Sequence, residues 1–111
     1  MRKSRIKGRQ TTYSKSLQNN EYWNDVKRHI RLRDNFHCQQ CGSGVRFEVH
    51  HISYKVDGKS IVGKELKHLG WLILLCSDCH AAVHKDITHP LHPYNFKKLN
   101  AEQFKRFKNV G

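Results

Sequence analysis

Two matched cysteine pairs constrain the fold of this chain more than any other feature of its sequence. Cys38 and Cys41 form the first Cys-x-x-Cys pair, and Cys76 and Cys79 form the second. Two intervening residues allow both thiolates of a tight turn to reach one tetrahedral Zn²⁺, and two pairs complete a four-sulfur site. The 34 residues between Cys41 and Cys76 predict a further structural unit inserted between the pairs. The alternative is four unligated cysteines that act as small hydrophobic residues, which the paired spacing disfavours.

The size and composition of the chain make a metal useful for folding. Its 111 residues are enough for one domain, and the apolar share of 37% is small for a self-sufficient core. Residues 1–9 contain no apolar stretch that could serve as a signal peptide, and the apolar run Trp71–Cys76 is too short to cross a membrane. We therefore expect a cytoplasmic protein, neither secreted nor bound to a membrane, whose cysteines bind zinc and form no disulfides.

A strong positive charge is the second feature of the composition. Lys and Arg number 21 and Asp and Glu 9, for a net charge of +12. A small domain with this charge is expected to bind a polyanion, most simply nucleic acid, although general solubility is an alternative explanation. The candidate nucleic-acid-binding residues are Arg2, Lys3, Arg5, Lys7, Arg9, Lys27, Arg28, Arg31, Lys105 and Arg106.

Hydrophobic periodicity predicts a basic arm followed by a helix. Residues 1–18 are basic and polar without periodicity, which is typical of a mobile arm. A helix is predicted to begin at Asn19 or Asn20 and to end near 34–35, because Tyr22, Val26 and Ile30 recur at one-turn intervals.

The rest of the chain is expected to alternate short strands and helices. Strands are predicted over 45–53 and 71–75, with a loop over 55–70 that contains a turn at 57–60 and a short helix over 64–68. A helix capped by Ser77 or Asp78 should cover about 79–85, and a last helix should follow Asn100 with Phe104 and Phe107 facing inward.

Four histidines near the cysteine pairs are surplus to a four-sulfur zinc site. His80 and His84 are four residues apart on a predicted helix, so both imidazoles can reach one cation, although such a pair is often incidental. His50 and His51 are neighbours on a predicted strand and should face opposite sides. One of the two can then bind a metal while the other activates water, as a metal-dependent hydrolase requires. The alternative for His51 is a core imidazole bonded to a backbone carbonyl.

Together these motifs resemble the zinc-braced HNH endonucleases, which have a ββα-metal fold related to the treble clef. The resemblance covers about residues 20–86, and it is carried by Cys-x-x-Cys-Gly, Glu48-Val-His-His51, Leu75-Cys-Ser-Asp-Cys-His80 and a further histidine four residues later. It implies that His51 is the general base, that His50, His80 and His84 hold a catalytic ion, and that the four cysteines hold a structural zinc. The chain departs from the family at Trp71, which occupies the place of the middle asparagine. That asparagine steadies the loop and presents a backbone carbonyl to the base.

We therefore expect a small α+β protein with a basic arm over 1–18 and a nuclease domain over 19–111. The core of that domain would span about 20–86, and a C-terminal helical extension would span 94–109. The expected activity is hydrolysis of DNA phosphodiester bonds, with double-stranded DNA as the partner, by an intracellular enzyme of bacterial or phage type. The catalytic ion would be Mg²⁺ or Mn²⁺, with Ni²⁺ or Zn²⁺ as alternatives. The alternative function is a zinc-dependent nucleic-acid-binding module with weak or no catalysis.

Overall fold

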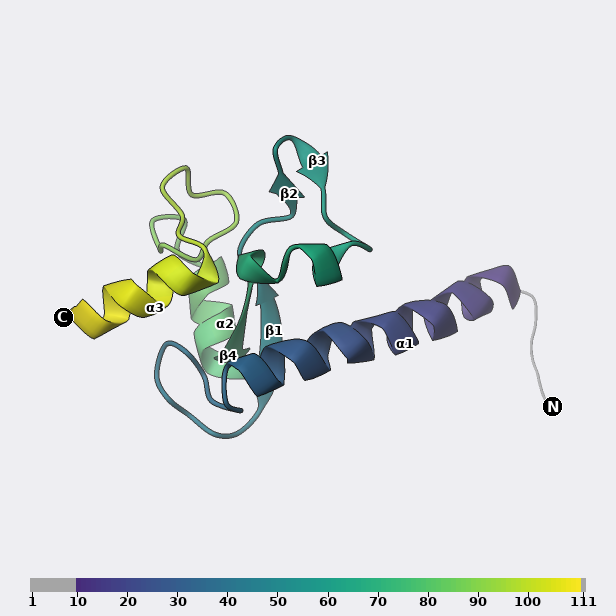
Figure 1. Ribbon diagram of the computed structural model, residues 1–111, viewed down its shortest axis with the longest axis horizontal. Coiled ribbons are helices and arrows are strands. Elements are labelled where there is room, and N and C mark those ends of the chain that lie inside the picture. The colour runs from purple at the N-terminus through teal and green to yellow at the C-terminus, as the bar shows by residue number, and fades with distance from the viewer. Residues whose placement is uncertain (1–9, 111) are drawn as a thin grey trace.

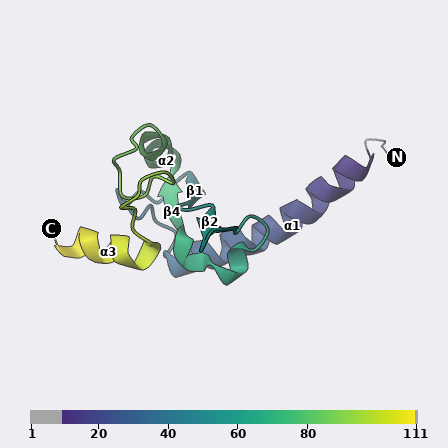
Figure 2. The ribbon, with the colours of Figure 1, turned by 90° about the horizontal axis from the view of Figure 1, so that it is seen from above.

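A long N-terminal helix forms one side of the molecule. The computed structural model describes residues 10–110, with side chains described for 21–108. Helix α1 spans Gln10–Arg33, and its first turns extend away from the rest of the protein (Figures 1 and 2). The predicted start at residues 19–20 was wrong, because 10–33 contains no Gly or Pro and the helix continues through 10–18 of the expected arm. Residues 1–9 lie outside the described residues.

The predicted end of this helix is confirmed, and its cause is visible in the backbone. Asn35 and Phe36 have positive φ angles of 57° and 55°, which a continuing right-handed helix cannot adopt. The chain then enters the turn of the first cysteine pair. Gly42, directly after Cys41, has a φ of +83° and its backbone N–H donates to the carbonyl oxygen of Cys38. A residue without Cβ is favoured at this position.

An antiparallel hairpin and one helix form the centre of the fold. Strand β1 (Phe47–His51) pairs with β4 (Leu72–Cys76), so that Phe47 lies opposite Cys76 and His51 lies opposite Leu72. Helix α2 (Ser77–His84) follows β4 directly and packs on the hairpin (Figure 1). Together they give the β-β-α arrangement of a small α+β protein, as predicted.

The segment between β1 and β4 contains more regular structure than the predicted loop. Strands β2 (Lys55–Val56) and β3 (Lys59–Ser60) form a second small hairpin around Asp57 and Gly58, both with positive φ. Two 3₁₀ turns, Glu65–Lys67 and Leu69–Trp71, then lead into β4. The first of these turns coincides with the short helix predicted over 64–68. Asp-Gly supplies the left-handed pair of residues that a two-residue hairpin turn needs.

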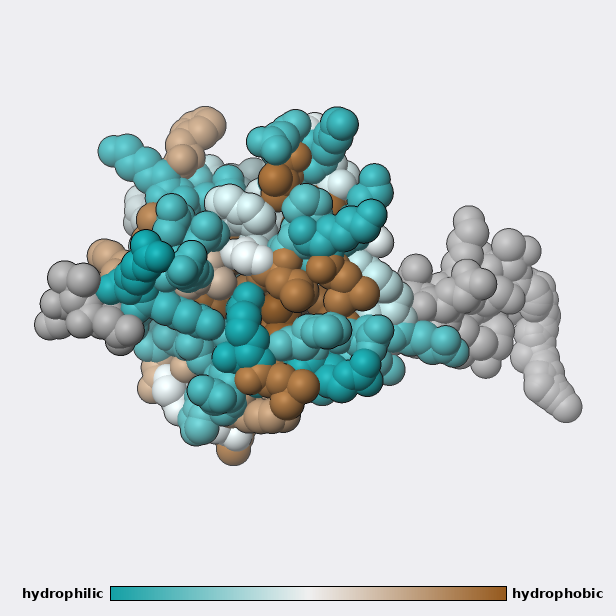
Figure 3. All heavy atoms as spheres, in the orientation of Figure 1, coloured by the Kyte–Doolittle hydropathy of each residue, from teal (hydrophilic) through white to brown (hydrophobic). Residues whose placement is uncertain are grey.

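Both faces of β4 are buried, which explains its uninterrupted apolar sequence. One face carries Leu72 and Leu74, which pack with Val26 and Ile30 of α1. The other face carries Ile73 and Leu75, which belong to a core shared with α2, the following connector and α3. Figure 3 shows apolar side chains gathered near the middle of one face of the protein, with polar side chains around them. The β1–β4 hairpin is therefore held between two helical layers.

Helix α3 (Ala101–Val110) closes the second core. Asn100 and Gln103 cap it reciprocally, each side-chain oxygen accepting from the other residue's backbone N–H at 2.8–2.9 Å. Phe104 is buried as predicted, but the prediction for Phe107 was wrong because its side chain is 56% exposed. Among the described residues, no helix is long and apolar enough to cross a membrane.

A buried carboxylate ties the end of α1 to β4 and α3. Asp34 accepts hydrogen bonds from the guanidinium of Arg33, the ammonium of Lys105 and the backbone N–H of Leu74. Burial raises the pKa of the Asp34 carboxyl, but Arg33, Lys105 and the Leu74 amide together outweigh burial and hold it below its ordinary value. Asp34 is therefore an ionised structural residue.

Candidate metal centres and active site

The four cysteines converge from two parts of the chain. Cys38 and Cys41 lie in the turn after α1, Cys76 ends β4, and Cys79 lies in the first turn of α2. All four sulfurs lie within 4.8 Å of one another, and the Sγ atoms of Cys41 and Cys76 are 3.7 Å apart. Two thiolates about 2.3 Å from one tetrahedral zinc ion would be about 3.8 Å apart. The cluster is therefore a metal-binding site with spacing that fits zinc.

Backbone amides support the sulfurs of both pairs. The N–H of Cys41 donates to Sγ of Cys38 at 3.4 Å, and the N–H of Cys79 donates to Sγ of Cys76 at 3.5 Å. Burial raises the pKa of the Cys38 thiol, but nearby backbone N–H donors outweigh burial and lower it to about 7. Burial and the three neighbouring thiols raise the pKa of Cys79. Four crowded thiols cannot all ionise without a cation, and a bound cation would deprotonate them.

Three histidines form a second cluster on the α2 side of the hairpin. His50 projects from β1, and His80 and His84 project from successive turns of α2. One ring nitrogen from each lies within 4.8 Å of the other two, and the ring centroids of His50 lie 5.0 Å from those of both helical histidines. The structure thus brings together the three residues expected to share an ion.

The contacts of His50 determine which of its nitrogens is free. Its Nε2–H donates to the carbonyl oxygen of Leu91 at 2.7 Å, since a carbonyl can only accept. Nδ1 therefore carries the lone pair, and it is the one buried side-chain N or O atom without a partner among the described residues. Burial lowers the pKa of His50 to about 3, the Leu91 carbonyl opposes this, and His80 and His84 add to the lowering. A neutral imidazole with a buried, unpartnered lone pair is a candidate metal ligand.

The two histidines of α2 direct ring nitrogens toward each other. Nδ1 of His80 donates to a carboxylate oxygen of Glu48 at 2.5 Å, which leaves Nε2 for a ligand. Nε2 of His80 and Nε2 of His84 are 3.2 Å apart. Two nitrogens about 2.1 Å from one ion would be about 3–3.4 Å apart, so this pair fits one cation. Burial lowers the pKa of His84, and the nearby His80 and His92 imidazoles lower it further.

His51 lies on the opposite face of the hairpin, as the strand alternation predicts. Its ring is stacked between Trp23 of α1, with centroids 5.5 Å apart, and Tyr54, with centroids 4.8 Å apart. Its Nε2 is 3.0 Å from a carboxylate oxygen of Glu65. The imidazole is therefore held on both faces and at one nitrogen.

Glu65 is the functional candidate that the sequence alone did not reveal. It is 3% exposed, and its second oxygen accepts the backbone N–H of Gly63 at 3.0 Å. A buried carboxylate needs such partners. The available signal was weak: Glu65 is the one acidic residue between Asp57 and Asp78.

The backbone of Trp71 is engaged in hydrogen bonds to other backbone groups. Its carbonyl oxygen accepts the backbone N–H of Ile52 at 2.8 Å, and its own N–H donates to His68. Among the described contacts, none joins the Trp71 carbonyl to the His51 ring. The described polar contact of the His51 ring is the one to Glu65.

The expected nucleic-acid-binding residues differ in their freedom to bind phosphate. Arg2, Lys3, Arg5, Lys7 and Arg9 lie outside the described residues. Lys27 and Arg31 lie partly exposed on α1, while exposed Arg28 and Arg106 pair with the nearby acids Asp25 and Glu102. Lys105 is partly exposed and pairs with buried Asp34 at 2.5 Å.

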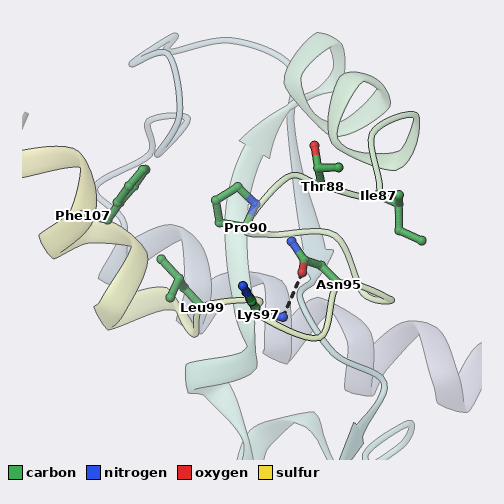
Figure 4. A pocket seen from close by; sticks show the side chains of 7 residues that line it. All are labelled: Ile87, Thr88, Pro90, Asn95, Lys97, Leu99 and Phe107. Atoms are coloured by element: carbon green, nitrogen blue, oxygen red, sulfur yellow. Dashed lines mark hydrogen bonds between the residues drawn. The ribbon is translucent and has the colours of Figure 1, made fainter.

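Two surface hollows lie on either side of the connector between α2 and α3. One, of about 470 Å³, is lined by Tyr54 and lies next to His51. The other, of about 500 Å³, lies between the connector and α3 and is lined by Ile87, Thr88, Pro90, Asn95, Lys97, Leu99 and Phe107 (Figure 4). This second hollow contains no cysteine or histidine, and its polar groups are partly engaged locally, as in the bond from the Lys97 N–H to the Asn95 side chain. The cysteine cluster, the histidine cluster and His51 therefore do not line this second hollow.

Comparison with known families agrees with this geometry. A family model described as HNH endonuclease matches residues 38–86, a segment that runs from the first cysteine through the end of α2. The segment contains both ligand clusters, His51 and Glu65. The match confirms the recognition of an HNH endonuclease domain in this part of the chain. No curated protein and no solved structure matches the chain.

Proposed function

We propose that the protein is a divalent-metal-dependent endonuclease that hydrolyses phosphodiester bonds in DNA. The observation that carries the proposal is that two adjacent histidines, His50 and His51, face different partners on opposite sides of β1. His50 directs an unpartnered lone pair toward His80 and His84, and His51 on the other face is fixed by a buried carboxylate. A general base beside a metal cluster is the arrangement that phosphodiester hydrolysis requires.

His51 is proposed as the general base. Because the Glu65 carboxylate accepts from Nε2, the ring proton is held at Nε2 and the lone pair stays on Nδ1. Nδ1 would take the proton from the attacking water, and the resulting imidazolium would be stabilised by the negative charge of Glu65. Stacking between Trp23 and Tyr54 would prevent the ring from rotating during the transfer. Glu65 is thus a positioning residue for the base.

His50, His80 and His84 are proposed as the ligands of the catalytic ion. The unpartnered Nδ1 of His50 and the facing Nε2 atoms of His80 and His84 fit a divalent cation. Such an ion supplies charge stabilisation to the phosphate and to the departing oxygen. Leu91 and Glu48 would keep the ring protons of His50 and His80 away from the ligand nitrogens. We propose Mg²⁺ or Mn²⁺ for this site, with Ni²⁺ or Zn²⁺ as alternatives.

The four cysteines are proposed to bind a structural Zn²⁺. Four sulfur ligands complete a tetrahedral shell and leave no position for water, so this ion would contribute to folding and take no part in hydrolysis. In domain terms, the nuclease unit would comprise 19–111, with 94–109 as a C-terminal extension. Residues 1–9 and the exposed basic side chains of α1 would contact DNA phosphates.

A plasmid-cleavage assay tests the activity directly. Zinc-loaded protein would be incubated with supercoiled plasmid and Mg²⁺, Mn²⁺, Ni²⁺ or added Zn²⁺ in turn, beside the His51→Ala variant as the control for contaminating nucleases. Metal-stimulated nicking or linearisation that disappears in the variant supports the proposal. Plasmid binding without cleavage in any metal would instead support the alternative, a nucleic-acid-binding module without catalysis.

A further inference from the structure

A groove beside His51 lies between two projections of the chain. One wall is formed by the segment that leads from β1 into β2, and the other by the connector between α2 and α3; both rise on the same edge of the molecule in Figure 1, with a notch between them in Figure 3. Its volume is about 470 Å³, within the range of sites that hold a small organic group. The lining residues are Ser53, Tyr54, Lys55, Pro93, Tyr94 and Lys98.

The first wall continues a stack of rings that includes the proposed base. The rings of Trp23 and His51 are parallel to within 4°, and those of His51 and Tyr54 to within 18°. Among the described residues, Tyr54 has no second aromatic neighbour, and it is 40% exposed. The stack therefore ends at the groove with a ring that can accept another flat group.

The second wall reaches toward the histidine cluster. The ring of Tyr94 lies 5.9 Å from that of His92, and His92 lies 6.3 Å from His84. Tyr94 itself is 73% exposed. The groove thus adjoins the proposed base through Tyr54 and the proposed metal ligands through Tyr94 and His92.

The chemistry of the lining fits one kind of ligand. Lys55 and Lys98 have no acidic partner among the ion pairs of the described side chains. Exposed aromatic rings combined with unpaired lysines are the combination that binds single-stranded nucleic acid, because bases stack on the rings and phosphates attract the ammonium groups. An apolar peptide would leave both lysines without a counter-charge.

We infer that this groove binds an unpaired nucleotide of the DNA substrate next to the cleaved phosphate. The inference rests on the proposed function and specifies its substrate class: DNA with a single-stranded or frayed segment at the cut. The base stacks on Tyr54 and against Tyr94, and the flanking phosphates lie near Lys55 and Lys98. A base inside a continuous duplex is covered by its neighbours and must be unstacked before it enters, which costs a few kcal/mol.

Binding measurements test the groove separately from catalysis. Zinc-loaded full-length protein, without any other divalent ion, is titrated into a short fluorescein-labelled single strand, the matching duplex, and a duplex with a single-stranded overhang. Tyr94→Ala removes the ring on the connector wall. Phe96→Ala is its matched control, because Phe96 is fully exposed two residues away and does not line the groove. Lys98→Ala is paired in the same way with Lys97→Ala, since Lys97 lines the separate hollow in Figure 4.

The expected result is a selective loss of single-strand binding. Loss of one stacked base is worth about 1–3 kcal/mol, so Tyr94→Ala should weaken affinity for the single strand and the overhang about fivefold to 150-fold, with less than about twofold for Phe96→Ala. Lys98→Ala should reduce the salt dependence of binding by about 0.7 log units per log unit of salt, and Lys97→Ala should leave it unchanged. A strand containing 2-aminopurine should lose fluorescence on binding the parent protein and recover it with Tyr94→Ala.

Other outcomes would overturn the inference without touching the nuclease assignment. Equal effects of Tyr94→Ala and Phe96→Ala would show that the groove holds no base, as would duplex binding at least as tight as single-strand binding. If the plasmid assay shows no cleavage but these binding differences appear, the groove stands and the nuclease proposal fails. If cleavage occurs and Tyr94→Ala leaves KM for an overhang substrate unchanged, the nuclease stands and the groove inference fails.

Discussion

The sulfur cluster and the histidine cluster share helix α2 but differ in their number of candidate ligands. Helix α2 supplies neighbouring residues to both: Cys79 joins the sulfur cluster and His80 joins the histidine cluster. The sulfur cluster offers four candidate ligands, the number that a full tetrahedral shell needs. The histidine cluster has three, with His51 close by on the other face of β1. A complete ligand shell favours stability and an incomplete one favours catalysis, so the two clusters suit different roles although both use α2.

The largest effect is expected from opening the sulfur cluster. Cys38→Ser should leave the protein unfolded or insoluble, because metal binding by such sites contributes on the order of 10 kcal/mol, similar to the whole stability of a small domain. Circular dichroism and the zinc content of the purified protein measure this. His84→Ala, an opening of the other cluster, should fold normally and keep one zinc. A folded, zinc-free Cys38→Ser protein would show that the sulfur cluster is not required for folding.

Loss of the base should affect the rate and spare the metal. His51→Ala is expected to reduce cleavage about 10²- to 10⁴-fold with unchanged affinity for the divalent ion, because His51 is proposed as the base and is not among the proposed ligands. His84→Ala should weaken ion binding, and excess metal should restore part of its activity. Titration calorimetry and plasmid cleavage separate the two variants. Inactive His50→Ala with its metal still bound, together with active His51→Ala, would invert the assignment of base and ligand.

Replacement of Asp34 tests how much its buried ion pairs stabilise the fold that holds both clusters. Asp34→Ala should lower the free energy of unfolding by about 3–5 kcal/mol, because Arg33 and Lys105 lose a buried counter-charge. Since the folded pKa of Asp34 is below its ordinary value of 3.8, its stabilisation is complete above that pH and is lost as the pH falls through the folded pKa. The difference in urea-unfolding stability between variant and parent should therefore be equal at pH 7 and pH 5. A difference that shrinks over this interval would contradict the depressed pKa.

The smallest effect should come from Glu65→Gln. The amide still reaches His51 but carries no charge to stabilise the imidazolium, so we expect a loss of about 10- to 100-fold in kcat with little change in KM. The pH profile of the rate should also shift, which a purely structural role would not cause. Glu48→Gln is the matched control, since Glu48 contacts His80, a proposed metal ligand, and makes no described contact to His51. An unchanged pH profile for Glu65→Gln would reject the positioning role.

The sequence predicted those parts of the site whose spacing is local. The cysteine pairs, the i, i+4 histidines and the alternation of His50 and His51 follow from turn, helix and strand geometry alone. Glu65 and Leu91 could not be predicted, because they reach their histidines across 14 and 41 residues through irregular segments. Leu91 also contributes only its carbonyl, which every residue has. The start of α1 was missed because residues 10–18 lack the apolar periodicity from which a helix is predicted. The helix nevertheless extends through them, since they contain no Gly or Pro that would end it.

Because the rings of Trp23 and His51 are stacked, the fluorescence of Trp23 is expected to report on the protonation of His51. An indole stacked on an imidazole loses fluorescence when that imidazole becomes a cation, so the emission of Trp23 should follow the charge state of His51. The second indole, Trp71, can be replaced by Phe to isolate the signal. Proton transfer at His51 could then be followed by light emission from α1, without a label and without waiting for product.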